Sequence, residues 1–100
     1  MPFPSHGLTH RSTVTGRRGM VASGHPLASL AGVQILLQGG NAIDAAVATA
    51  AALNVVEPYM SGIGGVGYMH IYSARDQAHK VCDYVGLTPA ATDIDMYEED

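Results

Sequence analysis

The chain has 100 residues, of which 47% are hydrophobic and 14% are charged, with a formal net charge of −4 at pH 7. This composition is too apolar for a disordered segment and is typical of one small globular unit. The few Lys and Arg residues form no long run and no aromatic-interleaved patch, so we expect no nucleic-acid partner.

Residues 1–18 are polar and contain prolines, and they predict an N-terminal arm ahead of a domain that fills residues 19–100. The short apolar run 19–24 predicts a strand. Pro26 suits the first turn of a helix, because its missing N–H needs no partner there. Apolar residues then keep helical spacing up to a Gly-Gly exit at residues 39–40.

A second helix is predicted over residues 42–54, with Asn41 as its N-cap. Its surface is almost entirely alanine, and a helix that is apolar nearly all round must be buried on most sides. Because 100 residues could hardly enclose it, we expect its packing partners to lie outside this chain. Asp44 on this helix would be costly to bury unpaired, so we expect a structural tie to Arg17 or Arg18, or to a loop amide.

The stretch SGIGGVG, residues 61–67, satisfies G-x-G-x-x-G, the spacing with which a strand-to-helix turn cradles a pyrophosphate. Here the predicted order is reversed, because a helix precedes the loop and two strands follow it. The strands are YMHIYSA, residues 68–74, and VCDYVG, residues 81–86, joined by a polar turn. We therefore interpret the glycines as tight turns and close packing against other backbone, not as a nucleotide site.

Spacing alone marks no active site. Ser23 and His25 are sequence neighbours, but geometry defines a catalytic triad, so we interpret His25 as a capping or turn residue. Ser61 lacks a G-x-S-x-G context and is expected to bond the local backbone. Asp93 and Asp95 lie in a polar tail and are expected to be solvated.

A lone cysteine, scattered histidines and short apolar runs narrow the class of protein further. Cys82 cannot form a disulfide within the chain, and its strand-like surroundings predict a small buried hydrophobic residue. The histidines lack metal-ligand spacing, so no zinc site is expected. With no secretory signal and no apolar run long enough to span a bilayer, we expect a cytoplasmic protein without a membrane partner.

Three ordered runs resemble the start of the large subunit of the gamma-glutamyltransferase (gamma-glutamyltranspeptidase) family. They are GRRGMVASGHPLAS, AGVQILLQGGNAIDAAVATAAALNVVEP and SGIGGVGYMHIY, within a match from about Gly16 to Ala91. The resemblance implies an α+β fold, the αββα four-layer sandwich of N-terminal nucleophile hydrolases. Residues 19–100 would then be an incomplete N-terminal fragment of that domain.

The resemblance also implies a chemistry. Family members are precursors that cleave themselves, and the new N-terminal Thr of the small subunit activates its hydroxyl with its own α-amino group. It attacks a γ-glutamyl or similar amide without a metal or organic cofactor. The implied partners are a small-molecule amide substrate and the rest of the chain's own precursor. Because the family's Thr lies far downstream, no catalytic residue is assigned within this chain.

One segment departs from the family pattern. After the second strand the family places an Arg that grips the substrate carboxylate, whereas CDYVGLTPAA puts Val85 or Leu87 at that position. An aliphatic side chain cannot replace a bidentate Arg–carboxylate contact. Val85 and Leu87 are thus the candidate substrate-pocket residues, unless they merely end the strand. A different acyl group, a carboxylate clamp from elsewhere and a catalytically silent structural relative stay open.

Overall fold

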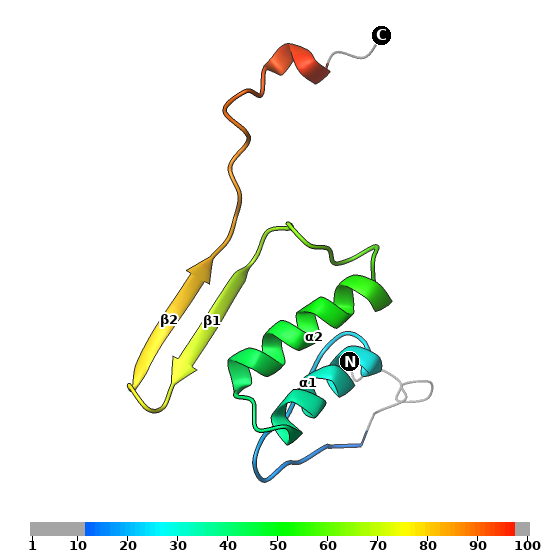
Figure 1. The fold of residues 1–100 in the computed structure, drawn as a ribbon, viewed down its shortest axis with the longest axis vertical. Coiled ribbons are helices and arrows are strands. Elements are labelled where there is room, and N and C mark those ends of the chain that lie inside the picture. Colours follow the sequence, from blue (N-terminus) through cyan, green and yellow to red (C-terminus); the bar gives the residue numbers. More distant parts are fainter. Residues whose placement is uncertain (1–11, 98–100) are drawn as a thin grey trace, which may run out of the picture.

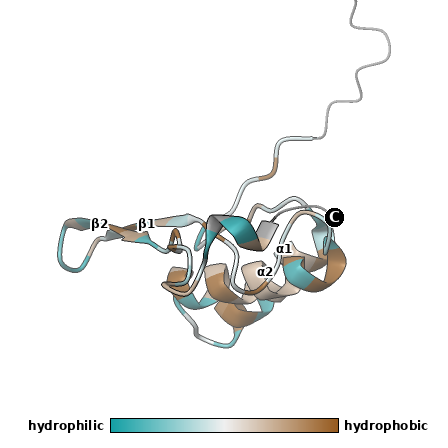
Figure 2. Cartoon of the chain, turned by 90° about the horizontal axis from the view of Figure 1, so that it is seen from above, coloured by the Kyte–Doolittle hydropathy of each residue, from teal (hydrophilic) through white to brown (hydrophobic). Residues whose placement is uncertain are grey.

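The computed structural model describes residues 12–97, and the hairpin extends to one side of a pair of packed helices (Figures 1 and 2). The predicted order of two helices, a glycine loop and a hairpin is confirmed. Of the predicted arm, residues 1–11 lie outside the described residues, and residues 12–18 form neither helix nor strand. The elements are α1 (Pro26–Leu37), α2 (Ala42–Val56), β1 (Tyr68–Ser73), β2 (Ala78–Asp83) and the 3-10 helix η1 (Ile94–Tyr97).

Local signals determine both ends of α1. His25 has extended backbone, and its Nδ1 accepts a hydrogen bond from the N–H two residues on, at 3.1 Å. This confirms the predicted capping role. At the other end, Gly39 adopts φ +90°, and the Gly40 N–H donates to the Ile35 carbonyl at 2.9 Å. The double glycine therefore closes the helix in the left-handed conformation that glycine favours.

A capping box starts α2. The Asp44 N–H donates to Asn41 Oδ1 at 2.9 Å, and the Asn41 N–H donates to Asp44 Oδ2 at 3.1 Å. Of the two partners predicted for Asp44, the loop amide is the one observed. The two reciprocal bonds satisfy backbone donors that the first turn leaves without helical partners. The helix then runs to Val56, two residues beyond the predicted end.

Small residues make the contact between the helices. Ala28 on α1 is fully buried, and Ala45 and Thr49 on α2 are 3% and 7% exposed. Gly32 lies directly against Thr49, because a Cβ at residue 32 would overlap the Thr49 Oγ1 atom. Thr49 directs its hydroxyl to the Ala45 carbonyl at 2.8 Å, which satisfies the polar atom within the contact. The two backbones can therefore approach closely.

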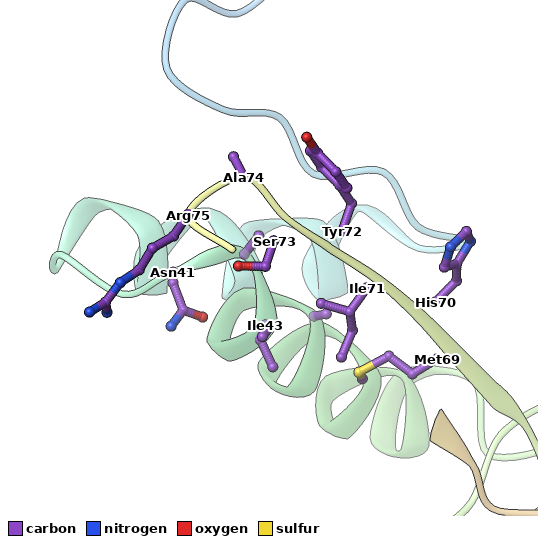
Figure 3. Close-up of a pocket in the computed structure, with 11 residues that line it drawn as sticks. Asn41, Ile43, Met69, His70, Ile71, Tyr72, Ser73, Ala74 and Arg75 are labelled. Carbon is purple, nitrogen blue, oxygen red and sulfur yellow. The ribbon is translucent and has the colours of Figure 1, made fainter. Parts of the chain in front are cut away.

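The antiparallel hairpin pairs Tyr68 with Asp83 at one end and Ser73 with Ala78 at the other. Alternate residues of β1 face opposite ways, as a strand requires: Met69 and Ile71 point toward α2, whereas His70 and Tyr72 point away (Figure 3). The predicted bounds of the second strand, 81–86, are three residues too late. The four-residue turn places Ala78 opposite Ser73, so Ala78, His79 and Lys80 join the ladder ahead of the predicted start at residue 81.

Two further expectations are wrong. Residues 19–24 form no strand, because a strand needs a ladder partner and this segment finds none among residues 12–97. Val21, within this segment, packs against Gly32 of α1 instead. Cys82 is exposed and not buried, because β2 lies at the edge of a two-stranded sheet whose face no described residue covers at this point.

Candidate functional site

Val85 and Leu87 lie in the irregular segment that follows β2, beyond the end of the strand. Asp83 ends β2, and its Oδ1 accepts a hydrogen bond from the Val85 N–H at 3.0 Å. This bond turns the chain out of the ladder. Val85 is 46% exposed and Leu87 is 95% exposed. Both candidates are therefore accessible aliphatic side chains within the described part of the chain.

The glycine loop, residues 61–67, connects the end of α2 to the start of β1. Gly64 adopts φ +84°, and the Gly65 N–H donates to the Gly62 carbonyl at 3.4 Å. The predicted tight turn is thus confirmed. A dinucleotide site would need a strand before the loop and a helix N-terminus after it. The loop has a helix C-terminus before it and a strand after it, so it offers no such site for phosphate.

Gly67 and Tyr84 extend the hairpin by one residue pair beyond β1 and β2. The Tyr84 N–H donates to the Gly67 carbonyl at 3.1 Å. A Cβ on Gly67 would lie 2.7 Å from the Tyr84 hydroxyl and 2.8 Å from two ring carbons. The predicted close approach at this glycine is real, but its partner is an aromatic side chain and not backbone.

Nothing in the linear spacing singles out Tyr84. Its position opposite Gly67 follows from the hairpin register, because Gly67 and Tyr84 are the next residues outward from the Tyr68–Asp83 pair. The one available signal was an aromatic residue and a glycine at mirrored positions about the turn. The turn length needed to align them was not evident from composition.

Tyr84 also borders an open cavity of about 870 Å³ between the glycine loop and the second half of α2. The Ser61 hydroxyl donates to Asn54 Oδ1 at 2.7 Å and ties the loop to the helix. The predicted bond from Ser61 to local backbone is therefore wrong, because a helix side chain provides the acceptor. The cavity is lined by Val47, Ala50, Ala51, Asn54, Met60, Ser61, Gly62, Gly64, Gly65, Val66 and Tyr84.

Ser23 and His25 form no nucleophile–base pair. The Ser23 hydroxyl donates to the His25 carbonyl at 2.8 Å and lies 2.6 Å from the Ser29 hydroxyl. The Nδ1 atom of His25 is occupied by its capping bond. Asp93 and Asp95 are exposed, as expected.

A second open cavity, of about 460 Å³, lies between the first turns of α2 and the strand β1 (Figure 3). Apolar side chains from both elements, Ile43 and Ile71 among them, line its length, and Asn41 and Arg75 lie together at one end. Arg75 belongs to the hairpin turn, whereas Val85 follows the opposite end of β2. This cavity therefore contains none of the predicted site residues.

His70 Nε2 and His79 Nδ1 lie 3.3 Å apart across the hairpin, a proximity that spacing along the chain does not reveal. Within residues 12–97, however, no group of three His, Cys, Asp or Glu side chains could hold a metal ion. In the same part of the chain, no helix has the length and apolar character needed to cross a membrane.

These elements and loops match known proteins. A family model described as Gamma-glutamyltranspeptidase matches residues 28–100. The chain is 56% identical over 88 residues to the Acylase ACY 1 proenzyme of Pseudomonas sp. (strain V22), covering 88% of this chain and 16% of that protein. It is 48% identical over 88 residues to the Glutathione hydrolase proenzyme of Bacillus subtilis (strain 168), covering 88% and 15%.

A solved structure supports the same match in three dimensions. The gamma-glutamyltranspeptidase of Helicobacter pylori superposes with a TM-score of 0.76 at 38% identity, over 88% of this chain and 25% of that one. The chain thus spans only 15% to 16% of the length of the two proenzymes named above. The likeness covers both the sequence and the arrangement of helices and hairpin.

Proposed function

Because the chain belongs to the gamma-glutamyltranspeptidase family, we propose that it is the N-terminal part of a self-processing amide hydrolase or acyltransferase. The observation that carries this proposal is the family match over residues 28–100. Its fold is correspondingly a piece of the N-terminal nucleophile hydrolase sandwich. The relatives named as an acylase and a glutathione hydrolase are both called proenzymes, which favours a precursor here as well.

In this proposal the nucleophile comes from sequence downstream of Asp100. Self-cleavage exposes a Thr whose α-amino group accepts the proton of its own hydroxyl. The hydroxyl oxygen attacks the amide carbonyl, the substrate's C–N bond breaks, and its leaving amine takes up the proton from the α-amino group. The acyl group, now an ester on the Thr, is then passed to water or to an acceptor amine. Residues 12–97 supply packing for the sandwich and one wall of the substrate site.

Val85 and Leu87 form part of that wall. Both are accessible in the segment after β2, and no Lys or Arg follows Lys80 in the chain. Aliphatic side chains favour an apolar portion of a ligand and offer a carboxylate no hydrogen-bond donor. We therefore propose an acyl group that lacks a carboxylate at this position.

The experiment is to read the coding sequence beyond Asp100 and to express the complete precursor. We expect two chains after purification, and a new N-terminal Thr on the second when its terminus is sequenced. Replacing that Thr with Ala should abolish both cleavage and amide hydrolysis. A precursor that stays intact and inactive, or a stop codon soon after Asp100, would instead identify a catalytically silent relative.

A further inference from the structure

We infer that Tyr84 is a positioning residue for the acyl-binding wall: its ring, held on Gly67, sets the direction in which Val85 leaves the sheet. The inference rests on the proposed function and deepens it. It assigns the enzyme to amides of uncharged acyl groups. Tyr84 does not itself need to contact the reacting atoms.

Backbone hydrogen bonds place Tyr84 at the end of the ladder. The Tyr84 N–H is bonded to the Gly67 carbonyl at 3.1 Å, which continues the β1–β2 ladder by one residue pair. The next N–H, that of Val85, leaves the ladder and donates to Asp83 Oδ1 at 3.0 Å. Tyr84 is thus the residue at which the chain passes from the sheet into the segment that carries Val85.

The Tyr84 ring lies directly against Gly67. Three atoms at the far end of the Tyr84 side chain occupy the space where a Cβ of residue 67 would lie, at 2.7 Å to 2.8 Å. Ordinary carbon contacts are about 3.5 to 4.0 Å, so only glycine admits the ring. The backbone of Gly67 is not among the positive-φ positions. Alanine would therefore fit the main chain and displace only the ring.

Tyr84 is also exposed to a cavity. Tyr84 is 49% exposed and lines the cavity between the glycine loop and α2. The bond between Ser61 and Asn54 ties that loop to the helix. The ring therefore lies at the junction between the cavity and the segment that carries Val85. Its phenol can offer a neutral hydrogen bond but no positive charge, which suits an uncharged acyl group.

The test compares Gly67→Ala with Gly19→Ala in the complete precursor. A Cβ on Gly19 would meet only the end of the Leu36 side chain, at 3.4 Å from Cδ1 and without the overlap found at Gly67, so Gly19→Ala is the matched control. KM and kcat are measured with hexanoyl p-nitroanilide and with γ-glutamyl p-nitroanilide. We expect Gly67→Ala to raise KM for the hexanoyl compound about tenfold, with kcat and self-cleavage kept within about twofold. Gly19→Ala should behave as the parent does.

A double-mutant cycle separates the ring from the loop. Tyr84→Ala alone should raise the same KM, and Gly67→Ala should add nothing further in the Tyr84→Ala background, because no ring is left to displace. If Gly67→Ala prevents folding, as judged by lost self-cleavage, Tyr84→Leu replaces it in the test. The same rise in KM for the hexanoyl compound is expected.

Three results would overturn the inference. One is an unchanged KM in Gly67→Ala or, where that variant does not fold, in Tyr84→Leu. Another is a Gly67→Ala effect that persists without Tyr84, because the glycine would then act through the loop. The third is a parent that hydrolyses neither anilide and is not cleaved, which would overturn the proposed function and with it the role of Tyr84. A parent active on the anilides therefore distinguishes failure of this inference from failure of the proposed function.

Discussion

The helix pair and the hairpin differ in how much of their packing lies within residues 12–97. Among the residues whose burial the structure describes, the buried ones are Ala28 and Gly32 of α1 and Ala45 and Thr49 of α2, where the two helices meet. The hairpin has complete strand pairing but no buried side chain, and Tyr68 is 67% exposed. The difference shows that backbone pairing can be complete in an element that still lacks the layer meant to cover it.

Even the helix pair is only partly covered. Hydrophobic segments occur along both helices (Figure 2), and Leu37 and Val55 are 79% and 78% exposed. In a four-layer sandwich each sheet packs between helices and a second sheet, so large apolar surfaces belong to neighbouring layers. The exposed surface of α2 supports the expectation that its packing partners lie outside this chain.

The largest expected effect comes from isolating this chain. Residues 1–100 expressed alone should show helical far-UV circular dichroism but no sharp near-UV signal and no cooperative thermal transition, because the hairpin and most of α2 lack partners. The complete precursor, measured under the same conditions, is the control. A cooperative transition in the isolated chain would remove the contrast between the two regions, since both would then be stable without further layers.

Overpacking the helix contact should have the next largest effect. Gly32→Val places a branched side chain where a Cβ already overlaps Thr49 Oγ1, and we expect a loss of about 3 kcal/mol in the free energy of unfolding. Thermal or denaturant unfolding of the complete protein measures this loss. Gly19→Ala, which meets only an ordinary contact, should stay near the parent value. An unaffected Gly32→Val variant would show that the helix contact is not close-packed.

Restoring a cation beside β2 should have a smaller effect, confined to substrate binding. Val85→Arg or Leu87→Arg in the complete enzyme should lower KM for γ-glutamyl p-nitroanilide about tenfold, because Arg can bind the carboxylate with two hydrogen bonds. Val85→Leu keeps the aliphatic character and should show no such gain. If both Arg variants leave activity on this substrate unchanged, the assignment of Val85 and Leu87 to the pocket is wrong.

The smallest expected effect concerns the capping box. Asn41→Ala removes the acceptor for the Asp44 N–H and should destabilise the first turn of α2 by about 1 kcal/mol. Asn41→Ser retains a capping oxygen, so the stability of this turn should stay within a few tenths of a kcal/mol of the parent value. Amide hydrogen exchange in the first turn of α2 measures both variants. Equal exchange in the two would show that tertiary packing, and not the cap, holds this end of the helix.

The helices could be predicted closely because their boundaries depend on residues a few positions apart. Pro26, the Gly39–Gly40 pair and Asn41 each act on backbone groups of the adjoining turn. The order around the glycine loop was likewise predictable, and it excluded the nucleotide interpretation of SGIGGVG without coordinates. Val85 and Leu87 were identified by resemblance to a family pattern, and their role stays a prediction.

What the sequence could not supply depends on contacts between distant segments. The apolar run 19–24 has strand-like composition but no ladder partner within the described range, and Cys82 has no covering layer there. The bounds of β2 followed from the length of the turn, which composition does not specify.

By itself, the sequence determined the helices, their caps, the reversed order around the glycine loop and the family. These features depend on local hydrogen bonds and on residue patterns that are legible along the chain. Only the tertiary structure decided that Tyr84 lies on Gly67, that Ser61 ties the loop to Asn54, and that Val85 follows the strand. Each of these depends on register or on the approach of separate elements, and a shift of one residue in a hairpin turns each side chain to the opposite face.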